Sequence, residues 1–213
     1  MKAQEQPFGR NYWEDRYAAP GHTWSGNPNP VLVAEAAALA PGRALDIGSG
    51  EGGDAIWLAL GGWHVMGIDI AENALQKARA RAEAVDLAAA DRIDWQQRDL
   101  TVWGPEPLSY DLVSAQFMHL PLPTRTELFR SLAAAVAPGG TLLIVGHDVV
   151  DVEEGGHRAH LRHVMFDVDE VVSAIAGESL AVEVAESRPR QVSDADGGIA
   201  VMHDVVVRAV RSL

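Results

Sequence analysis

The feature that most constrains the fold is an alternation that begins at residue 43. Short apolar runs rich in β-branched residues alternate there with longer, alanine-rich segments of helical period. Such alternation indicates βαβ units, in which helices cover both faces of a parallel sheet. We expect parallel strands at residues 43–47, 63–69, 93–97, 110–116 and 141–147. We expect the helices between them at residues 54–60, 71–89 and 124–137, the last of which stops at Pro138-Gly139-Gly140.

The C-terminal third has a different character. A further helix is expected at residues 167–176, followed by strands at 179–186 and 201–210 that a turn-rich segment, 189–198, connects. Two adjacent strands after the last crossover form an antiparallel hairpin at the edge of a sheet. The sequence therefore predicts an α/β fold of three αβα layers, with a doubly wound, seven-stranded sheet that is mostly parallel and ends in a C-terminal hairpin.

The length of 213 residues fits a single domain spanning 1–213. At this size roughly 70% of the unfolded chain's surface can be buried, so a core forms without disulfide bonds. We divide the domain into an N-terminal cap segment and helix (1–40), a core (43–147), a lid loop (148–165) and a helix plus hairpin (166–213). Asn29-Pro30 opens the N-terminal helix, expected at residues 31–40.

Composition excludes several functional classes. The chain has no cysteine, which excludes disulfides, thiolate metal ligands and a cysteine nucleophile. Its net charge of −13 repels nucleic-acid phosphates and anionic lipid, so we expect neither nucleic acid nor membrane as a partner. No apolar run is long enough to span a bilayer, and the first 21 residues lack a secretory core. We expect a cytoplasmic protein, either a monomer or a homodimer.

A glycine-rich turn follows the first predicted strand. Residues 44–47 run into Gly48-Ser49-Gly50-Glu51-Gly52-Gly53, and a helix begins immediately afterwards. Glycines permit positive φ and let a ligand approach the backbone, and the helix start offers unpaired N–H groups. By itself this pattern leaves a nucleotide site and a purely structural turn equally open.

Three aspartates at successive strand ends narrow the choice of ligand. Asp46 precedes the glycines, where a carboxylate would repel a pyrophosphate but suits a ligand with an ammonium group. Asp69 ends the next strand, about 20 residues on, where it can accept both hydroxyls of a ribose. Asp99 follows the third strand and can accept an exocyclic amine. S-adenosylmethionine satisfies all three. Alternatively, Asp46 could cap backbone amides of the following turn, Asp69 could be a solvated residue at a strand end, and Asp99 could be an ordinary acidic loop residue.

These residues resemble the class I S-adenosylmethionine-dependent methyltransferases. The segments that carry the resemblance are Leu45-Asp46-Ile47-Gly48-Ser49-Gly50-Glu51-Gly52, Gly67-Ile68-Asp69-Ile70, Arg98-Asp99-Leu100, Tyr110-Asp111-Leu112-Val113 and residues 132–144. The opening residues 12–17 and 24–29 are similar to small bacterial methyltransferases of the tellurite-resistance and thiopurine types. The resemblance implies a Rossmann-like fold, with S-adenosylmethionine as cofactor and S-adenosylhomocysteine as product.

The resemblance also implies a set of contacts with the cofactor. Asp46 and the backbone of the glycine turn would face its methionine part, Asp69 its ribose, and Asp99 with the Leu100 N–H its adenine. Arg16 would lie near its carboxylate. The cofactor-binding residues implied in this way are Asp46, Gly48, Ser49, Gly50, Gly52, Asp69, Ile70, Asp99, Leu100, Gln116, Trp13 and Arg16. Gly53-Asp54 departs from the commoner Gly-Arg-Asn of the subgroup and leaves contacts from position 54 open.

The acceptor side is expected around Trp24, Phe117, His119 and His147. His119 and His147 follow the fourth and fifth strands, so both point toward the edge of the sheet where ligands bind. Either could act as a general base, although a structural role is the more common one for such a histidine. His157, His160 and His163 recur every third residue and share a helical face only in part, so we expect no metal site.

Methyl transfer from a sulfonium is an in-line displacement, in which the protein mainly supplies alignment and excludes water. The residues after the fourth strand, Ser114-Ala115-Gln116-Phe117, lack the Asn/Asp-Pro-Pro-aromatic pattern used on nucleic-acid bases. A small-molecule acceptor remains, such as a thiol or another soft nucleophile that needs little more than a pocket. Two other readings stay open: a nicotinamide-dependent oxidoreductase, which Asp46 disfavours, and a protein that binds S-adenosylmethionine without catalysis.

Overall fold

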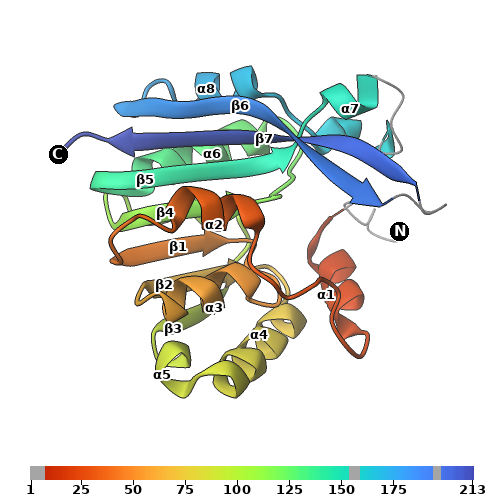
Figure 1. Cartoon of the computed structure of the whole chain (residues 1–213), viewed down its shortest axis with the longest axis vertical. Helices are drawn as coiled ribbons and strands as arrows, with labels where there is room; N and C mark the ends of the chain where they lie inside the picture. The colour runs from red at the N-terminus through yellow and green to blue at the C-terminus, as the bar shows by residue number, and fades with distance from the viewer. Residues whose placement is uncertain (1–7, 154–158, 194–197) are drawn as a thin grey trace.

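A computed structural model describes residues 8–153, 159–193 and 198–213. It contains one seven-stranded sheet in the order β3-β2-β1-β4-β5-β7-β6 (Figure 1). The strands are β1 (Arg43–Ile47), β2 (His64–Asp69), β3 (Ile93–Gln97), β4 (Tyr110–Gln116), β5 (Val136–His147), β6 (Leu180–Ser193) and β7 (Ile199–Arg211). The helices are α1 (Arg10–Ala18), α2 (Pro30–Ala36), α3 (Gly53–Leu60), α4 (Glu72–Val85), α5 (Leu87–Ala90), α6 (Thr124–Ala135), α7 (Val150–Glu153), the 3₁₀ helix η1 (Ala159–Val164) and α8 (Val168–Ile175).

The strand pairing confirms the predicted fold class. β1 to β5 pair in parallel, β7 pairs antiparallel with β5, and β6 pairs antiparallel with β7 at the edge. The strand order reverses between β1 and β4, and in such sheets a ligand crevice forms beyond the carboxyl ends of the strands at this point. Helix α1 lies at that edge (Figure 1).

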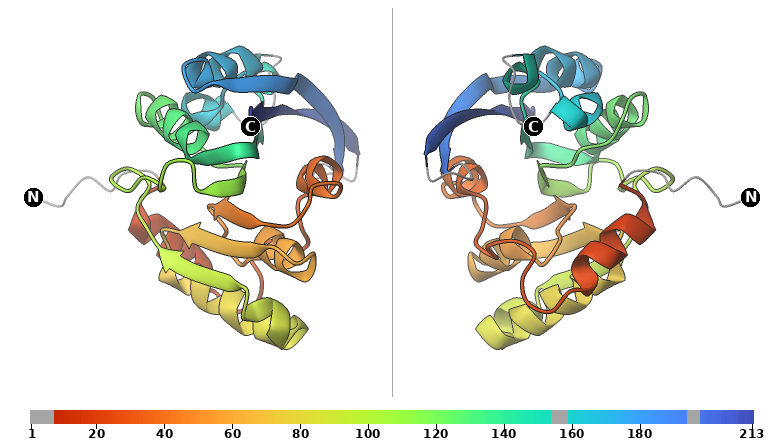
Figure 2. Two further views of the ribbon diagram at one scale, coloured as in Figure 1. Left: turned by 90° about the vertical axis from the view of Figure 1, so that its left-hand side faces the viewer. Right: turned by 90° about the vertical axis from the view of Figure 1, so that its right-hand side faces the viewer.

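The two faces of the sheet are covered by different helices. Ala44 and Leu112 pack under α2 and α3, whereas the next residues along the strands, Leu45 and Val113, pack under α6 and α8. Figure 2 shows α2 and α3 (orange) on the opposite side of the sheet from α6 (green). This alternation produces the three-layer αβα arrangement that the sequence predicts.

Two predicted helix boundaries are wrong. The helix expected at residues 71–89 is divided into α4 and α5 at Asp86, whose extended backbone (φ −164°) breaks the helix while its Oδ1 accepts the N–H of Ala89 at 2.7 Å. The helix expected at 124–137 ends at Ala135, because β5 already begins at Val136. Pro138-Gly139-Gly140 therefore lies within the strand, where the pairing with β4 shifts register.

The C-terminal hairpin is longer than predicted. The expected turn at 189–198 is wrong in its first part, because residues up to Ser193 continue β6. Pro189 is tolerated there because β6 is an edge strand. Arg188 of β6 and Arg208 of β7 both bond to Glu35 of α2, at 2.8 and 3.1 Å, so the hairpin is anchored to the helix layer.

Three further segments differ from expectation. Helix α1 forms within residues 1–28, for which we predicted no helix, and α2 ends at Ala36, earlier than the predicted 40. The predicted lid loop contains α7 and η1, while its residues 154–158 lie outside the described ranges. None of the helices in the described ranges is long and apolar enough to cross a bilayer.

Candidate active site

The glycine turn connects β1 to α3. Gly48, Gly50 and Gly52 have φ values of +71°, +53° and +81°, the left-handed region that favours glycine. The N–H of Ser49 donates to the carbonyl of Ile68 at 2.8 Å, so the turn is tied to β2 as well as to β1. The turn therefore has a defined shape at the point where the strand order reverses.

Side chains from three distant segments pack against the glycines. A Cβ on Gly52 would lie 2.6 Å from Cη2 of Trp95, so this glycine is required by packing on β3. A Cβ on Gly48 would lie 2.5 Å from Sδ of Met118, and one on Gly50 would lie 3.0 Å from the hydroxyl of Tyr17. The turn is thus the meeting point of β3, the segment after β4 and α1.

Three carboxyl groups share the space beneath this turn. Burial raises the pKa of Asp46 well above its usual range, and the nearby Asp54 and Asp69 raise it further. Burial also raises the pKa of Asp54 to about 6, although its Oδ1 accepts the N–H of Asn29 at 2.6 Å. The pKa of Asp69 is raised by burial too. Clustered buried acids of this kind favour binding of a cation.

Asp69 connects the end of β2 to the glycine turn. Its Oδ2 accepts the N–H of Gly50 and its Oδ1 accepts the N–H of Ala71, both at 2.9 Å. Each carboxylate oxygen has a second lone pair, so these bonds leave capacity for the hydroxyl groups of a ligand. Asp69 therefore holds the turn in place and remains suited to the role that the sequence predicts.

Polar atoms without a partner gather around the same turn. Within the described ranges, Oδ2 of Asp46, Oγ of Ser49 and Oε1 of Gln116 are buried and make no hydrogen bond. Gln116 is oriented by its Nε2, which donates to Oγ of Ser114 at 2.9 Å. Buried acceptors are rarely left unpaired in proteins, so these atoms fit a ligand that brings its own donors, such as an ammonium group.

The residues predicted to contact adenine have local partners. Oδ1 of Asp99 accepts from the N–H and the hydroxyl of Thr101, at 2.9 and 2.7 Å. The carbonyl of Ile70 accepts from Nε2 of Gln97 at 2.9 Å, and Leu100 is half-buried against the core. Asp99 thus stabilises its own loop, and its contact with a ligand stays a prediction.

The N-terminal segment (residues 8–29) is fastened over this site. The carboxylate of Glu14 accepts the N–H groups of Glu72 and Asn73, at 2.9 and 3.0 Å, and so caps the start of α4. The buried carboxylate of Glu51 accepts the N–H groups of Thr23 and Trp24, at 2.9 and 3.1 Å. Sequence reasoning identified neither glutamate, because each binds a partner far away in the chain.

The aromatic residues of the N-terminal segment occupy different positions. Tyr17 is buried, its hydroxyl accepts the indole N–H of Trp24 at 2.9 Å, and burial raises its pKa. Trp13 packs with Tyr17 against Ala71 at the start of α4. Sequence reasoning missed Tyr17, although its spacing of four residues from Trp13 places both on one helix face.

Two predicted residues of this segment are more exposed. The guanidinium of Arg16 lies over the ring of Trp24, 4.8 Å from its centroid, and Trp24 is 49% exposed. The predicted contact of Arg16 with a ligand carboxylate therefore stays a prediction. The same holds for the role of Trp24 at the acceptor pocket.

The remaining acceptor-side residues meet after β4 and β5. The ring of His147 lies 4.6 Å from that of Phe117 and 4.8 Å from that of His119, measured between centroids. His163 is exposed and lies near Phe8, whereas His157 and the side chain of His160 are outside the described part of the chain. Among the side chains that the structure describes, no group of three or more His, Asp or Glu could hold a metal ion.

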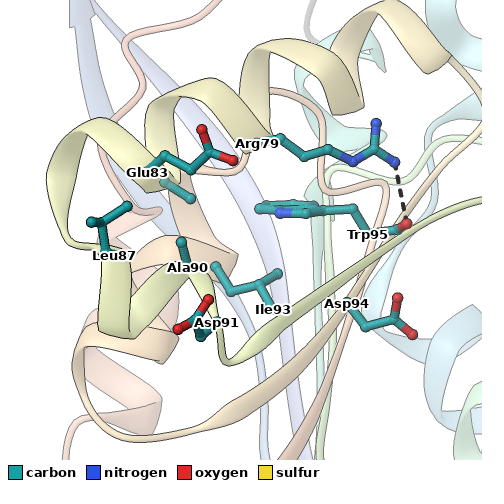
Figure 3. A pocket seen from close by; sticks show the side chains of 9 residues that line it. Arg79, Glu83, Leu87, Ala90, Asp91, Ile93, Asp94 and Trp95 are labelled. Atoms are coloured by element: carbon teal, nitrogen blue, oxygen red, sulfur yellow. Dashed lines mark hydrogen bonds between the residues drawn. The ribbon is translucent and has the colours of Figure 1, made fainter.

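A separate hollow of about 400 Å³ lies on another side of the molecule. Figure 3 shows that its lining comes from α4, α5 and β3, with Trp95 beside Arg79, whose Nη2 donates to the Trp95 carbonyl at 3.3 Å. Since the other side of the Trp95 ring packs on Gly52, this hollow lies behind the glycine turn and is not part of the candidate site.

Comparisons with known proteins agree with this geometry. Residues 44–140 match a family described as a methyltransferase domain. Ubiquinone biosynthesis O-methyltransferase of Marinobacter nauticus is 30% identical over 122 residues, which cover 54% of this chain and 50% of that protein. Probable thiol methyltransferase 2 of Arabidopsis thaliana is 31% identical over 104 residues, which cover 47% and 45%. The chain spans about half the length of these curated relatives.

Solved structures extend the likeness over almost the whole chain. A structure from work on the conversion of a disulfide bond into a thioacetal group during echinomycin biosynthesis has a TM-score of 0.71. Its sequence identity is 21%, and the match covers 96% of this chain and 90% of the other. At this identity the likeness establishes the fold alone, including the C-terminal hairpin that the family match does not reach.

Proposed function

We propose that this chain, whose residues 44–140 match a family described as a methyltransferase domain, is a class I S-adenosylmethionine-dependent methyltransferase that acts on a small molecule. The observation that carries the proposal is the glycine turn with its buried acids and its unpaired acceptors. Asp46 has a raised pKa because it is buried beside Asp54 and Asp69, and its Oδ2 makes no hydrogen bond to the described residues. A cationic ligand with an ammonium group relieves both conditions.

Different residues at the carboxyl edge of the sheet would bind different parts of the cofactor. Asp46, Ser49 and Gln116 would accept from its ammonium group, and Asp69 would accept from its ribose hydroxyls. Asp99 and Leu100 would bind the adenine edge, and Ile70 would lie along its face. When bound, S-adenosylmethionine supplies a methyl group already activated by its sulfonium. The protein then needs only to align an acceptor and exclude water, which suits a site closed by the N-terminal segment.

The acceptor class follows from charge and from the surroundings of the site. A net charge of −13 disfavours nucleic acid, which favours a small-molecule acceptor. We further propose that the protein acts in the cytoplasm. A thiol or another soft nucleophile would demand least of the protein, in line with the similarity of residues 12–17 and 24–29 to the tellurite-resistance and thiopurine subgroup. The curated relatives include both an O-methyltransferase and a thiol methyltransferase, so the experiment must include both classes.

Two measurements test this proposal. Isothermal titration should detect binding of S-adenosylhomocysteine and none of NADH, because the buried Asp46 repels a pyrophosphate. Transfer of a labelled methyl group should then be measured on a panel of thiols, phenols, selenite and tellurite. Binding of NADH in preference would overturn the cofactor assignment. Binding of S-adenosylhomocysteine without transfer to any acceptor would support a non-catalytic binding protein instead.

A further inference from the structure

The segment after β4 connects the glycine turn to a pair of histidines. Sδ of Met118 fills the space beside Gly48, while the neighbouring residues Phe117 and His119 face the ring of His147. Phe117 has a φ of +56°, an unfavourable value for an aromatic residue, and its N–H donates to the carbonyl of Val145 in β5 at 2.7 Å. His119 follows Met118 directly and stacks on His147, so the two histidines are connected to the glycine turn through Met118.

His147 is oriented by a buried carboxylate. Its Nδ1 lies 3.2 Å from Oδ1 of Asp204, the residue opposite it in the β5–β7 pairing. Asp204 is 2% exposed, and its Oδ2 accepts from Nε of Arg190 at 2.5 Å. Since a carboxylate only accepts hydrogen bonds, Nδ1 of a neutral His147 carries the proton, and Nε2 holds the basic lone pair.

His119 differs in its hydrogen bonding. Its Nε2 accepts the backbone N–H of His147 at 3.1 Å, so this nitrogen is committed to a structural bond. Its ring stacks on that of His147 with an interplanar angle of 20°. His119 therefore positions His147, whose Nδ1 faces a carboxylate that stabilises an imidazolium.

We infer that His147, oriented by Asp204, is the general base that removes the proton of a hydroxyl acceptor, so that the acceptor class is a phenol or a similarly weak O–H acid. This inference rests on the proposed function and, of the two acceptor classes considered there, selects the hydroxyl class in place of the thiol. In the step, Nε2 takes the acceptor proton while the oxygen forms a bond to the methyl carbon. The carbon–sulfur bond breaks and its electron pair remains on sulfur, which becomes neutral. Asp204 balances the charge of the imidazolium until its proton passes to solvent.

Titratable and charged side chains from the segment after β4 and from the hairpin of β6 and β7 surround His147 in the described ranges. His119 faces it from the segment after β4, and Asp204 and Arg190 face it from the hairpin. A second pair, Asp151 with His203, involves the residue before Asp204 in β7, with Oδ1 of Asp151 2.8 Å from Nδ1 of His203. Asp204 contacts the imidazole of His147 directly, so it is the residue to alter.

The first experiment uses the ligand-free protein and measures no activity. Long-range ¹H–¹⁵N NMR of protein with ¹⁵N-labelled histidine should show the proton of neutral His147 on Nδ1. The variant Asp204→Asn should shift the tautomer population toward Nε2, because the Asn side chain can donate as well as accept. A wild-type His147 that carries its proton on Nε2 would overturn the inference.

The second experiment compares two acceptors under one set of conditions. At about pH 8 phenol is still protonated, whereas 4-nitrophenol is largely ionised and needs no base. The variant His147→Gln should lower kcat/KM about 100-fold for phenol and change it little for 4-nitrophenol, with unaltered affinity for S-adenosylhomocysteine. The control variant His64→Gln, at the exposed start of β2, should alter neither rate.

The outcomes separate this inference from the proposed function. An equal loss on both phenols would give His147 a merely structural role and overturn the inference alone. Transfer to thiols with none to either phenol would also overturn it while the methyltransferase assignment stands. A wild-type protein that binds S-adenosylhomocysteine and methylates no acceptor of the panel would overturn both.

Discussion

The variant Asp46→Asn should make the ligand-free protein more stable and weaken its binding of the cofactor. Asp46 is 1% exposed, and its Oδ2 has no hydrogen-bond partner in the described part of the chain. A buried charged group left in this state costs about 1–3 kcal/mol. Asparagine keeps the shape of the side chain and removes the charge, so unfolding should require about that much more free energy.

The pH dependence provides the sign of this effect. The pKa of Asp46 in the folded protein is raised above its ordinary value of 3.8, so the folded state holds the proton more tightly than the unfolded state. The contribution of Asp46 to wild-type stability is therefore present at low pH and is lost as pH rises from 3.8 through the folded pKa, by about 1.4 kcal/mol per pH unit at most. The advantage of Asp46→Asn should be absent at acid pH and grow toward neutrality.

Thermal unfolding and isothermal titration measure the two halves of the prediction. At neutral pH the melting temperature should rise by about 2–4 °C for each kcal/mol gained. Affinity for S-adenosylhomocysteine should fall about 10–100-fold, the loss of one hydrogen bond to a charged group. The control variant Asp94→Asn alters an exposed strand residue and should change neither quantity. A less stable Asp46→Asn protein with wild-type affinity would refute the reasoning.

Three other variants test the residues that hold the glycine turn and the N-terminal segment in place. Asp69→Ala removes the acceptor of two backbone N–H groups, so calorimetry should show weaker binding of S-adenosylhomocysteine, by about 10-fold or more, and thermal unfolding a lower melting temperature. Glu14→Ala removes the cap of α4, so chemical denaturation should show a free energy of unfolding lower by about 1 kcal/mol. Limited trypsin digestion should also cut the N-terminal segment of this variant faster, unless S-adenosylhomocysteine is present. Gly52→Ala places a Cβ 2.6 Å from the Trp95 ring at a φ of +81°, so denaturant unfolding should show a free energy of unfolding lower by about 1–3 kcal/mol. The control Gly21→Ala has open space around it, and its free energy of unfolding should fall less.

The core of the fold was predictable because its signals are local. The apolar runs of the five parallel strands and the glycine turn after Ile47 depend on neighbours in sequence, and the structure places them close to the predicted positions. Helix α1 was not predictable in this way. Its residues are polar on most sides, and its attachment depends on Glu14, which binds α4 across 58 residues.

The site was predictable where strand ends determine position. Asp46 and Asp69 meet because β1 and β2 are adjacent and parallel, which the alternation of elements already implies. Glu51 and Asp204 could not be found from the sequence, because each acquires its role from a partner placed by the tertiary fold. Asp204 faces His147 only through the β5–β7 pairing, in a strand whose register the sequence leaves open.

The distribution of partners among the buried acids links stability to function at this site. Glu51 and Asp69 have backbone N–H donors for their carboxylates, and Asp204 has Arg190, so these groups stabilise the folded chain without a ligand. The pKa of Asp46 is raised, as is that of Asp69, but Asp46 differs because one of its oxygens makes no bond to the described residues. A carboxylate kept at a cost in stability is expected where a ligand supplies the missing donor. The ammonium group of the cofactor would stabilise the ionised form of Asp46 and so lower its pKa. Binding of the cofactor should therefore release a proton from Asp46. Calorimetry in buffers of different ionisation enthalpy should detect that release.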